Sequence, residues 1–107
     1  RRYGIPSLAA DDPYYNPKGY WNGPVWVEWN ALIVHGLINY GYNDLAAEIT
    51  DRVAKNMIAQ LKKDHNFWEF YSPDHQWAGY HKSYIWAGII ARMMIDCNEG
   101  RRINFKE

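Results

Sequence analysis

Residues 24–41 read PVWVEWNALIVHGLINYG, a nearly continuous apolar stretch. We predict a helix from Pro24 to Gly41, because proline suits the first helical position and glycine suits the end of a helix. The polar exceptions are one narrow stripe and, opposite it, Asn30, which we expect to be a structural hydrogen-bonding residue. A helix this apolar needs neighbours on most sides. The stripe is formed by Glu28, His35 and Asn39.

A second helix is predicted from Asp44 to Asp64, after a very short turn and with Asn43 as its N-cap. Its pattern is amphipathic, so one side should face water. Charged pairs at four-residue spacing support the polar side; they are Glu48–Arg52 and Asp51–Lys55. The apolar side is formed by Leu45, Ala46, Ile49, Val53, Met57 and Leu61.

A third helix, Lys82–Asn98, is again apolar nearly all round, with Arg92 and Asp96 placed to pair along it. The order is therefore inner, outer and inner helix, with long, very short and long connections. This layout predicts an all-α fold in which helical hairpins form part of an α/α barrel. The two long loops should meet on the face where the inner helices begin, and there the helix N-termini favour a carboxylate or an anion.

The 107 residues correspond to one small domain. Three helices cannot close a ring, and their apolar faces would stay exposed in so short a chain. The chain also begins with Arg1-Arg2-Tyr3-Gly4 and has no initial Met. We therefore expect residues 1–107 to be a fragment of a larger domain, or a chain that must associate with other copies.

Twelve basic residues balance twelve acidic ones, which argues against nucleic-acid or anionic-membrane partners. No apolar run reaches membrane-spanning length, and no signal-peptide pattern is present. The single cysteine, Cys97, excludes an internal disulfide framework and leaves the compartment open, with the cytoplasm favoured.

Neither a metal nor a cofactor is expected from the motifs. The spacing of three histidines matches no zinc signature, and no glycine-rich phosphate loop or nucleophile motif occurs. The histidines are His65, His75 and His81.

The loop Asn66–Tyr80 combines one carboxylate, Glu69, with many aromatic rings. Aromatic faces stack on the C–H faces of sugars, and a carboxylate supplies acid–base chemistry. The irregular stretch 1–23 carries further aromatic residues, which argues for function in a loop this long. Trp68, Trp77 and Tyr80 fit loop packing as well as ligand stacking. We interpret the two loops together as a carbohydrate site.

Three segments together match a known pattern: Tyr20-Trp21-Asn22-Gly23-Pro24-Val25-Trp26, Glu69-Phe70-Tyr71-Ser72-Pro73 and Tyr84-Ile85-Trp86-Ala87-Gly88. They resemble the last third of the catalytic domain of glycoside hydrolase family 63, which includes processing α-glucosidases and mannosylglycerate hydrolases. The resemblance implies an (α/α)6 barrel and an inverting mechanism, with Glu69 as general base. It places Trp21, Gly23 and Trp26 on the wall of the sugar pocket and Trp86 on the last inner helix, and Tyr20 joins them as a substrate-binding residue.

Two departures from the family pattern are visible. Asn22 stands where these enzymes commonly have Arg, which leaves the sugar and linkage open. The family's general acid, an Asp, has no counterpart here, so the chain alone should be inactive.

Two other functions stay open from the sequence. One is a non-catalytic carbohydrate-binding or assembly fragment, and the other is a helical oligomer whose aromatic faces are interfaces.

Overall fold

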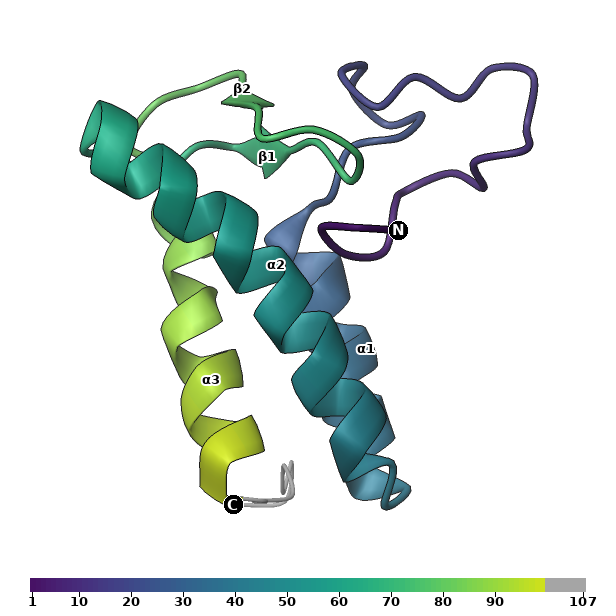
Figure 1. Ribbon diagram of the computed structural model, residues 1–107, viewed down its shortest axis with the longest axis vertical. Helices are drawn as coiled ribbons and strands as arrows, with labels where there is room; N and C mark the ends of the chain where they lie inside the picture. The colour runs from purple at the N-terminus through teal and green to yellow at the C-terminus, as the bar shows by residue number, and fades with distance from the viewer. Residues whose placement is uncertain (100–107) are drawn as a thin grey trace.

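The computed structural model describes residues 1–99, and helices dominate it (Figure 1). The mostly helical class predicted from the sequence is confirmed. Figure 1 shows α1 and α3 running in one direction. Helix α2, which lies between them in the sequence, runs in the opposite direction. The elements are α1 (Val27–Asn39), α2 (Asn43–Asp64), β1 (Phe70–Tyr71), β2 (Ala78–Gly79), the 3-10 helix η1 (Ile85–Ile89) and α3 (Ile90–Glu99).

Helix α1 begins at Val27, so the predicted start at Pro24 is wrong. The backbone of Val25 is extended and pairs with Tyr71, which withdraws it from the helix. The predicted end is close to the observed one. Gly41 takes a φ of 86°, a conformation that glycine adopts without strain.

Helix α2 begins at Asn43 itself, and the predicted Asn43 cap is wrong. Tyr42 is the N-cap residue, with no side-chain hydrogen bond, and its carbonyl accepts the Ala46 amide at 3.0 Å. The predicted ion pairs on the exposed side are confirmed at 2.6 Å for Glu48–Arg52 and 2.9 Å for Asp51–Lys55.

The third helical segment starts later than Lys82, and it starts as a 3-10 helix at Ile85. Ser83 has a φ of 54°, which a right-handed helix cannot accommodate. The amide of Tyr84 instead donates to the carbonyl of Phe67 at 2.9 Å, tying this segment back to the Glu69 loop. The predicted Arg92–Asp96 pair is confirmed at 3.0 Å.

The core lies where α2 packs against both α1 and α3. Asp96 is fully buried in this core, and its carboxylate lies 3.7 Å from Nε2 of His35, a residue of the predicted polar stripe of α1. In the described part of the chain, no helix combines the length and apolar character needed to cross a membrane. The largest fully buried apolar side chains are Tyr71, Phe70, Ile38, Met57 and Met93.

Much of the apolar surface of α1, η1 and α3 stays exposed in this chain. Trp29 and Leu32 on α1 are 53% and 55% exposed, and Ile85 on η1 is 83% exposed. As expected, the two predicted inner helices carry apolar side chains on their outer sides as well. Among residues 1–99 nothing covers these outer sides.

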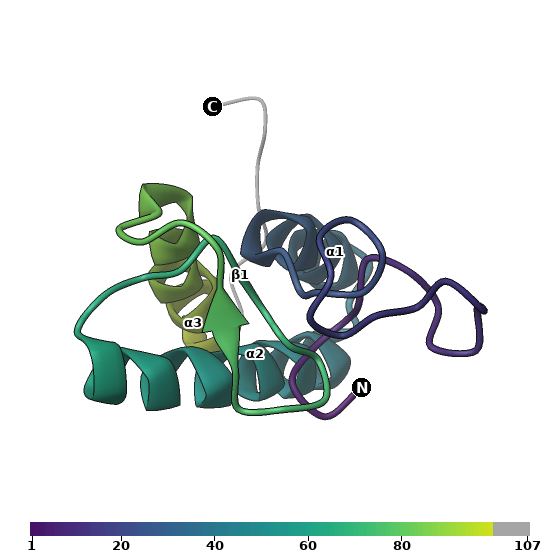
Figure 2. The same ribbon diagram turned by 90° about the horizontal axis from the view of Figure 1, so that it is seen from above.

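Both long loops gather at the end of the helices where α1 and α3 begin, as Figures 1 and 2 show from two directions. The Tyr3 amide donates to the Pro73 carbonyl at 2.9 Å and so links the first loop to the second. Asn30 fastens the first loop to α1: it donates to the Ile5 carbonyl at 3.0 Å and accepts the Ile5 amide at 2.9 Å. Its predicted structural role is confirmed.

Candidate active site

A short hairpin with two residues in each strand positions Glu69, and the sequence analysis did not predict it. Strands β1 and β2 are antiparallel, with Phe70 opposite Gly79. The buried amide group of Asn56 on α2 lies within 3.1–3.2 Å of three hairpin carbonyl oxygens. A ladder this short gains its order from such anchors. The three carbonyls belong to Ser72, His75 and Trp77.

Glu69 directly precedes β1 and is only 6% exposed. Its Oε1 lies 2.8 Å from His81 Nδ1, and its Oε2 accepts the Tyr20 hydroxyl at 3.2 Å. Its own amide donates to the His81 carbonyl at 3.0 Å. A buried carboxylate held at both oxygens is oriented, and each oxygen keeps a lone pair for a water or a sugar hydroxyl.

Tyr20 links Glu69 to a group of aromatic rings that we call the aromatic wall. Its ring meets four others edge-on, at centroid distances of 5.1–5.7 Å, an arrangement favoured by aromatic quadrupoles. Partial burial and the bond to Glu69 raise the pKa of Tyr20, so its hydroxyl stays a donor. The four rings are Trp21, Trp26, Phe70 and Tyr80.

The structure brings most of the predicted pocket residues together, in different roles. Trp21 is 59% exposed and stacks on Trp26, which is 2% exposed, at 4.2 Å. A side chain on Gly23 would lie 2.1 Å from the Asn16 carbonyl oxygen, so this glycine permits close packing of the loop. Trp86 is placed apart: it lies on η1, 63% exposed, with its ring 5.7 Å from that of Tyr84.

Two cavities adjoin the Tyr20 cluster. One of about 370 Å³ includes Trp21, Trp26 and Trp29 in its lining. The other, of about 620 Å³, includes Trp77 and Tyr80, which places these two loop rings at a cavity. Trp68 instead packs inward, and its indole donates to Asp64 at 3.2 Å. The larger cavity is lined by Lys18, Gly19, Tyr20, Phe70, Trp77, Gly79 and Tyr80.

A second carboxylate, Glu28 in the first turn of α1, lies close enough to Glu69 for their charges to interact. Burial raises the pKa of Glu28, and the charge of Glu69 raises it further. Its Oε2 is buried without a hydrogen-bond partner among residues 1–99. Burial and the charges of both carboxylates also raise the pKa of Tyr84.

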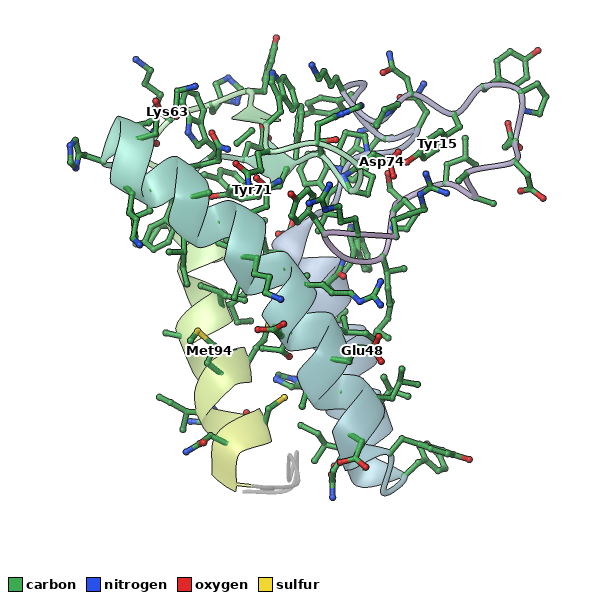
Figure 3. The ribbon with its side chains drawn as sticks, viewed as in Figure 1. Tyr15, Glu48, Lys63, Tyr71, Asp74 and Met94 are labelled. Atoms are coloured by element: carbon green, nitrogen blue, oxygen red, sulfur yellow. The ribbon has the colours of Figure 1, made fainter. Side chains whose placement is uncertain are left out.

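The hairpin is also anchored from the first loop, through Asp74. Figure 3 shows Tyr15 and Asp74 directed toward one another, and the tyrosine hydroxyl donates to the carboxylate at 2.6 Å. Arg1 donates to the other oxygen of Asp74 at 2.6 Å. Burial opposes ionisation of Asp74, but these two hydrogen bonds outweigh it and lower its pKa. Burial and the bond to Asp74 raise the pKa of Tyr15 to about 12.

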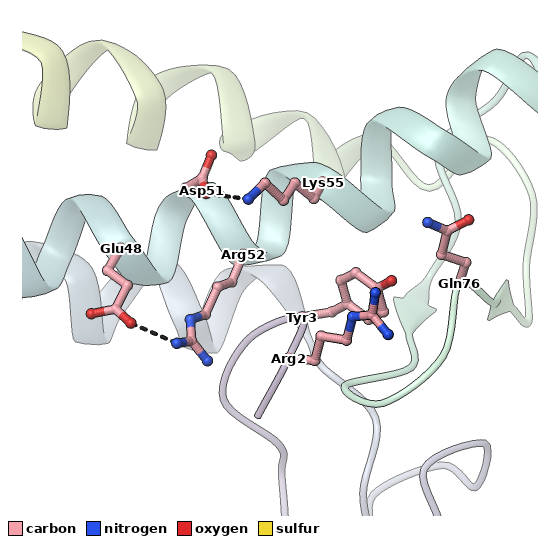
Figure 4. A pocket seen from close by; sticks show the side chains of 7 residues that line it. All are labelled: Arg2, Tyr3, Glu48, Asp51, Arg52, Lys55 and Gln76. Carbon is pink, nitrogen blue, oxygen red and sulfur yellow. Dashed lines mark hydrogen bonds and ion pairs between the residues drawn. The ribbon is translucent and has the colours of Figure 1, made fainter.

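The cavity in Figure 4, of about 750 Å³, is charged and shares no lining residue with the aromatic cavities. Its two acidic side chains form the two ion pairs of α2, drawn as dashed lines, and Arg2 adds a further positive charge. Within residues 1–99, no three potential metal-ligating side chains form a cluster.

Sequence reasoning missed His81, Glu28 and Asn56 as parts of the site. His81 follows a turn whose geometry is set by distant contacts, so no local signal marks it. Glu28 belongs to the predicted polar stripe, and the sequence does not place it in the first helical turn, because α1 begins at Val27 and not at the predicted Pro24.

Comparison with known proteins gives the family. The family model for the mannosylglycerate hydrolase MGH1-like glycoside hydrolase domain matches residues 1–87. Mannosylglycerate hydrolase MGH2 of Selaginella moellendorffii is 39% identical over 71 residues, 66% of this chain and 14% of that protein. The mannosylglycerate hydrolase of Thermus thermophilus is 35% identical over 72 residues, 67% of this chain and 16% of that protein.

A third relative covers more of the chain. The probable mannosyl-oligosaccharide glucosidase of Schizosaccharomyces pombe is 31% identical over 104 residues, 86% of this chain and 13% of that protein. The chain thus spans a small part, 13–16%, of these relatives' lengths. The expected resemblance is confirmed, and the chain belongs to the family of mannosylglycerate hydrolase MGH1-like glycoside hydrolase domains.

Proposed function

We propose that this chain forms the general-base side of the active site of an inverting glycoside hydrolase that acts on α-linked glucosides or mannosides. The observation that carries the proposal is the environment of Glu69. This carboxylate is 6% exposed, hydrogen-bonded at both oxygens, and surrounded by aromatic side chains. It lies where two loops meet in a chain of a glycoside hydrolase family.

The proposed chemistry is removal of a proton from a water molecule by Glu69. Inverting glycosidases use two carboxyl groups about 6.5–9.5 Å apart, so that the water fits beneath the anomeric carbon. In this proposal the second group, the acid that protonates the leaving oxygen, is an Asp in another part of the full-length protein. Residues 1–107 alone would therefore have no turnover.

The proposed binding surface is the aromatic wall beside Glu69. Trp21 and Tyr20 are exposed enough to meet a sugar ring, and Trp26 supports them from below. Gly23 lets their loop close, and Trp86 is assigned to a more distant part of the pocket. Relatives named for mannosylglycerate and for mannosyl-oligosaccharides suggest small glycosides or oligosaccharides as substrates.

The proposed setting is an (α/α)6 barrel, of which this chain is the C-terminal portion. The exposed apolar sides of α1, η1 and α3 support this, since surfaces of this kind are normally covered. Further helices of the same domain would cover them; self-association is the alternative.

The test compares Glu69→Gln with the wild-type full-length protein on an aryl α-mannoside and an aryl α-glucoside. Loss of a general base should lower kcat by about 10²- to 10⁴-fold while sugar binding is retained. Glu48→Gln, at an exposed position of α2, is the matched control and should keep its activity. Unchanged turnover of Glu69→Gln would remove Glu69 from the mechanism. NMR of the first product should show the β anomer, and an α anomer would exclude inversion.

A further inference from the structure

His81 and Glu69 are joined at both side chain and backbone. The imidazole Nδ1 lies 2.8 Å from Oε1 of Glu69, and the Glu69 amide donates to the His81 carbonyl at 3.0 Å. An ionised carboxylate only accepts hydrogen bonds, so the shared proton belongs to Nδ1. The two residues are 12 positions apart, on either side of the β1–β2 hairpin.

The exposure of the two partners differs sharply. The Glu69 side chain is 8% exposed, whereas that of His81 is 67% exposed. A histidine that served only packing would be buried with its partner. His81 instead leaves one face in solvent, and its ring meets Tyr80 edge-on at 4.7 Å.

We infer that His81 is a positioning residue for Glu69: its Nδ1–H fixes Oε1, so that a lone pair of the carboxylate points toward the attacking water. The inference rests on the proposed function. Without the imidazole, Tyr20 would be the remaining side-chain donor to Glu69 in the described part of the chain, and the carboxylate could turn about its last bond. A misoriented base loses rate because catalysis depends on the alignment of the reacting atoms.

The experiment uses two substitutions in the full-length protein. Asparagine places an amide N–H near the position of Nδ1, and leucine removes the donor. His81→Leu should lower kcat about 10- to 100-fold with little change in KM, the usual cost of losing a hydrogen bond to a charged group. His81→Asn should keep most of kcat, because its amide N–H replaces the lost donor to Oε1.

The matched control is His75→Leu, because His75 is an exposed histidine of the same loop. It should leave kcat and KM unchanged. Equal losses in His81→Asn and His81→Leu, or wild-type kinetics in His81→Leu, would overturn the inference. Turnover retained by Glu69→Gln would instead refute the proposed function, so the two failures are distinguishable.

Discussion

The backbone of Val25 exchanges two hydrogen bonds with the backbone of Tyr71, with N···O distances of 2.7 and 3.0 Å. This bridge joins the loop before α1 to the strand that follows Glu69. Both residues are almost completely buried, at 0% and 1% exposure. The bridge therefore fixes the distance between the aromatic wall and the carboxylate.

Removing one of these hydrogen bonds should loosen the site. In Val25→Pro the donor to the Tyr71 carbonyl is lost, and an unsatisfied buried carbonyl costs about 1–3 kcal/mol. We expect faster hydrogen–deuterium exchange across residues 69–72 and lower kcat. Pro24→Ala keeps both bonds and should match the wild type; equal effects of the two substitutions would show that the bridge is unimportant.

Replacement of Asn56 by aspartate, which has the same shape, should destabilise the protein. In Asn56→Asp, one carboxylate oxygen would face the three carbonyl oxygens that now accept from the amide group. Gln60, 3.3 Å from the other oxygen, would be its side-chain donor among the described residues, which is too little to compensate a buried charge. We expect a destabilisation of several kcal/mol and increased exchange in residues 72–77. Asp51→Asn, on the exposed side of α2, is the control. Normal protection of the hairpin in Asn56→Asp would disprove the anchor.

Two glycines should respond oppositely to alanine. Gly23→Ala would force a methyl group against the Asn16 carbonyl and displace the loop that holds Tyr20 and Trp21, so activity should fall. Gly36 lies inside α1, and apart from its chain neighbours and the adjacent backbone of the helix, no heavy atom of the described residues lies within 4 Å of an added Cβ. Gly36→Ala should stabilise the protein by about 0.5–1 kcal/mol. Thermal unfolding and kcat measure both, and full activity in Gly23→Ala would contradict the packing role.

Glu28→Gln should stabilise the protein at neutral pH. The pKa of Glu28 is raised by burial and by Glu69, so folding favours the neutral form. The stability associated with this neutral form is present at low pH and is lost as the pH rises through the folded-state pKa. The melting temperature of Glu28→Gln should exceed that of the wild type at pH 7, and the difference should vanish near pH 4. A difference that grows toward pH 4 would show the opposite sign.

The three helical segments were predictable because their signals are local. Apolar periodicity, four-residue charge pairs and Gly41 lie within the segments that they define, and the structure confirms these features. The failures lie where distant contacts intervene. Val25 is drawn out of a helix by Tyr71, and Ser83 is held in a left-handed conformation at a turn that returns to Phe67.

The candidate site was predictable only in part for the same reason. Glu69 and the aromatic residues could be found in two linear motifs, whereas the bond between Tyr20 and Glu69 spans 49 positions. The importance of Asn56 and His81 follows from where the hairpin folds, and no short motif encodes that geometry.

The short β1–β2 hairpin has a consequence for how the sequences of such proteins diversify. Asn56 and Val25 fasten its backbone, while the side chains of His75 and Gln76 at its tip are exposed. Substitution of these two side chains changes the outer surface of the hairpin and leaves intact the backbone bonds that hold Glu69. Evolution or a protein engineer could therefore vary this outer surface while the position of Glu69 is kept.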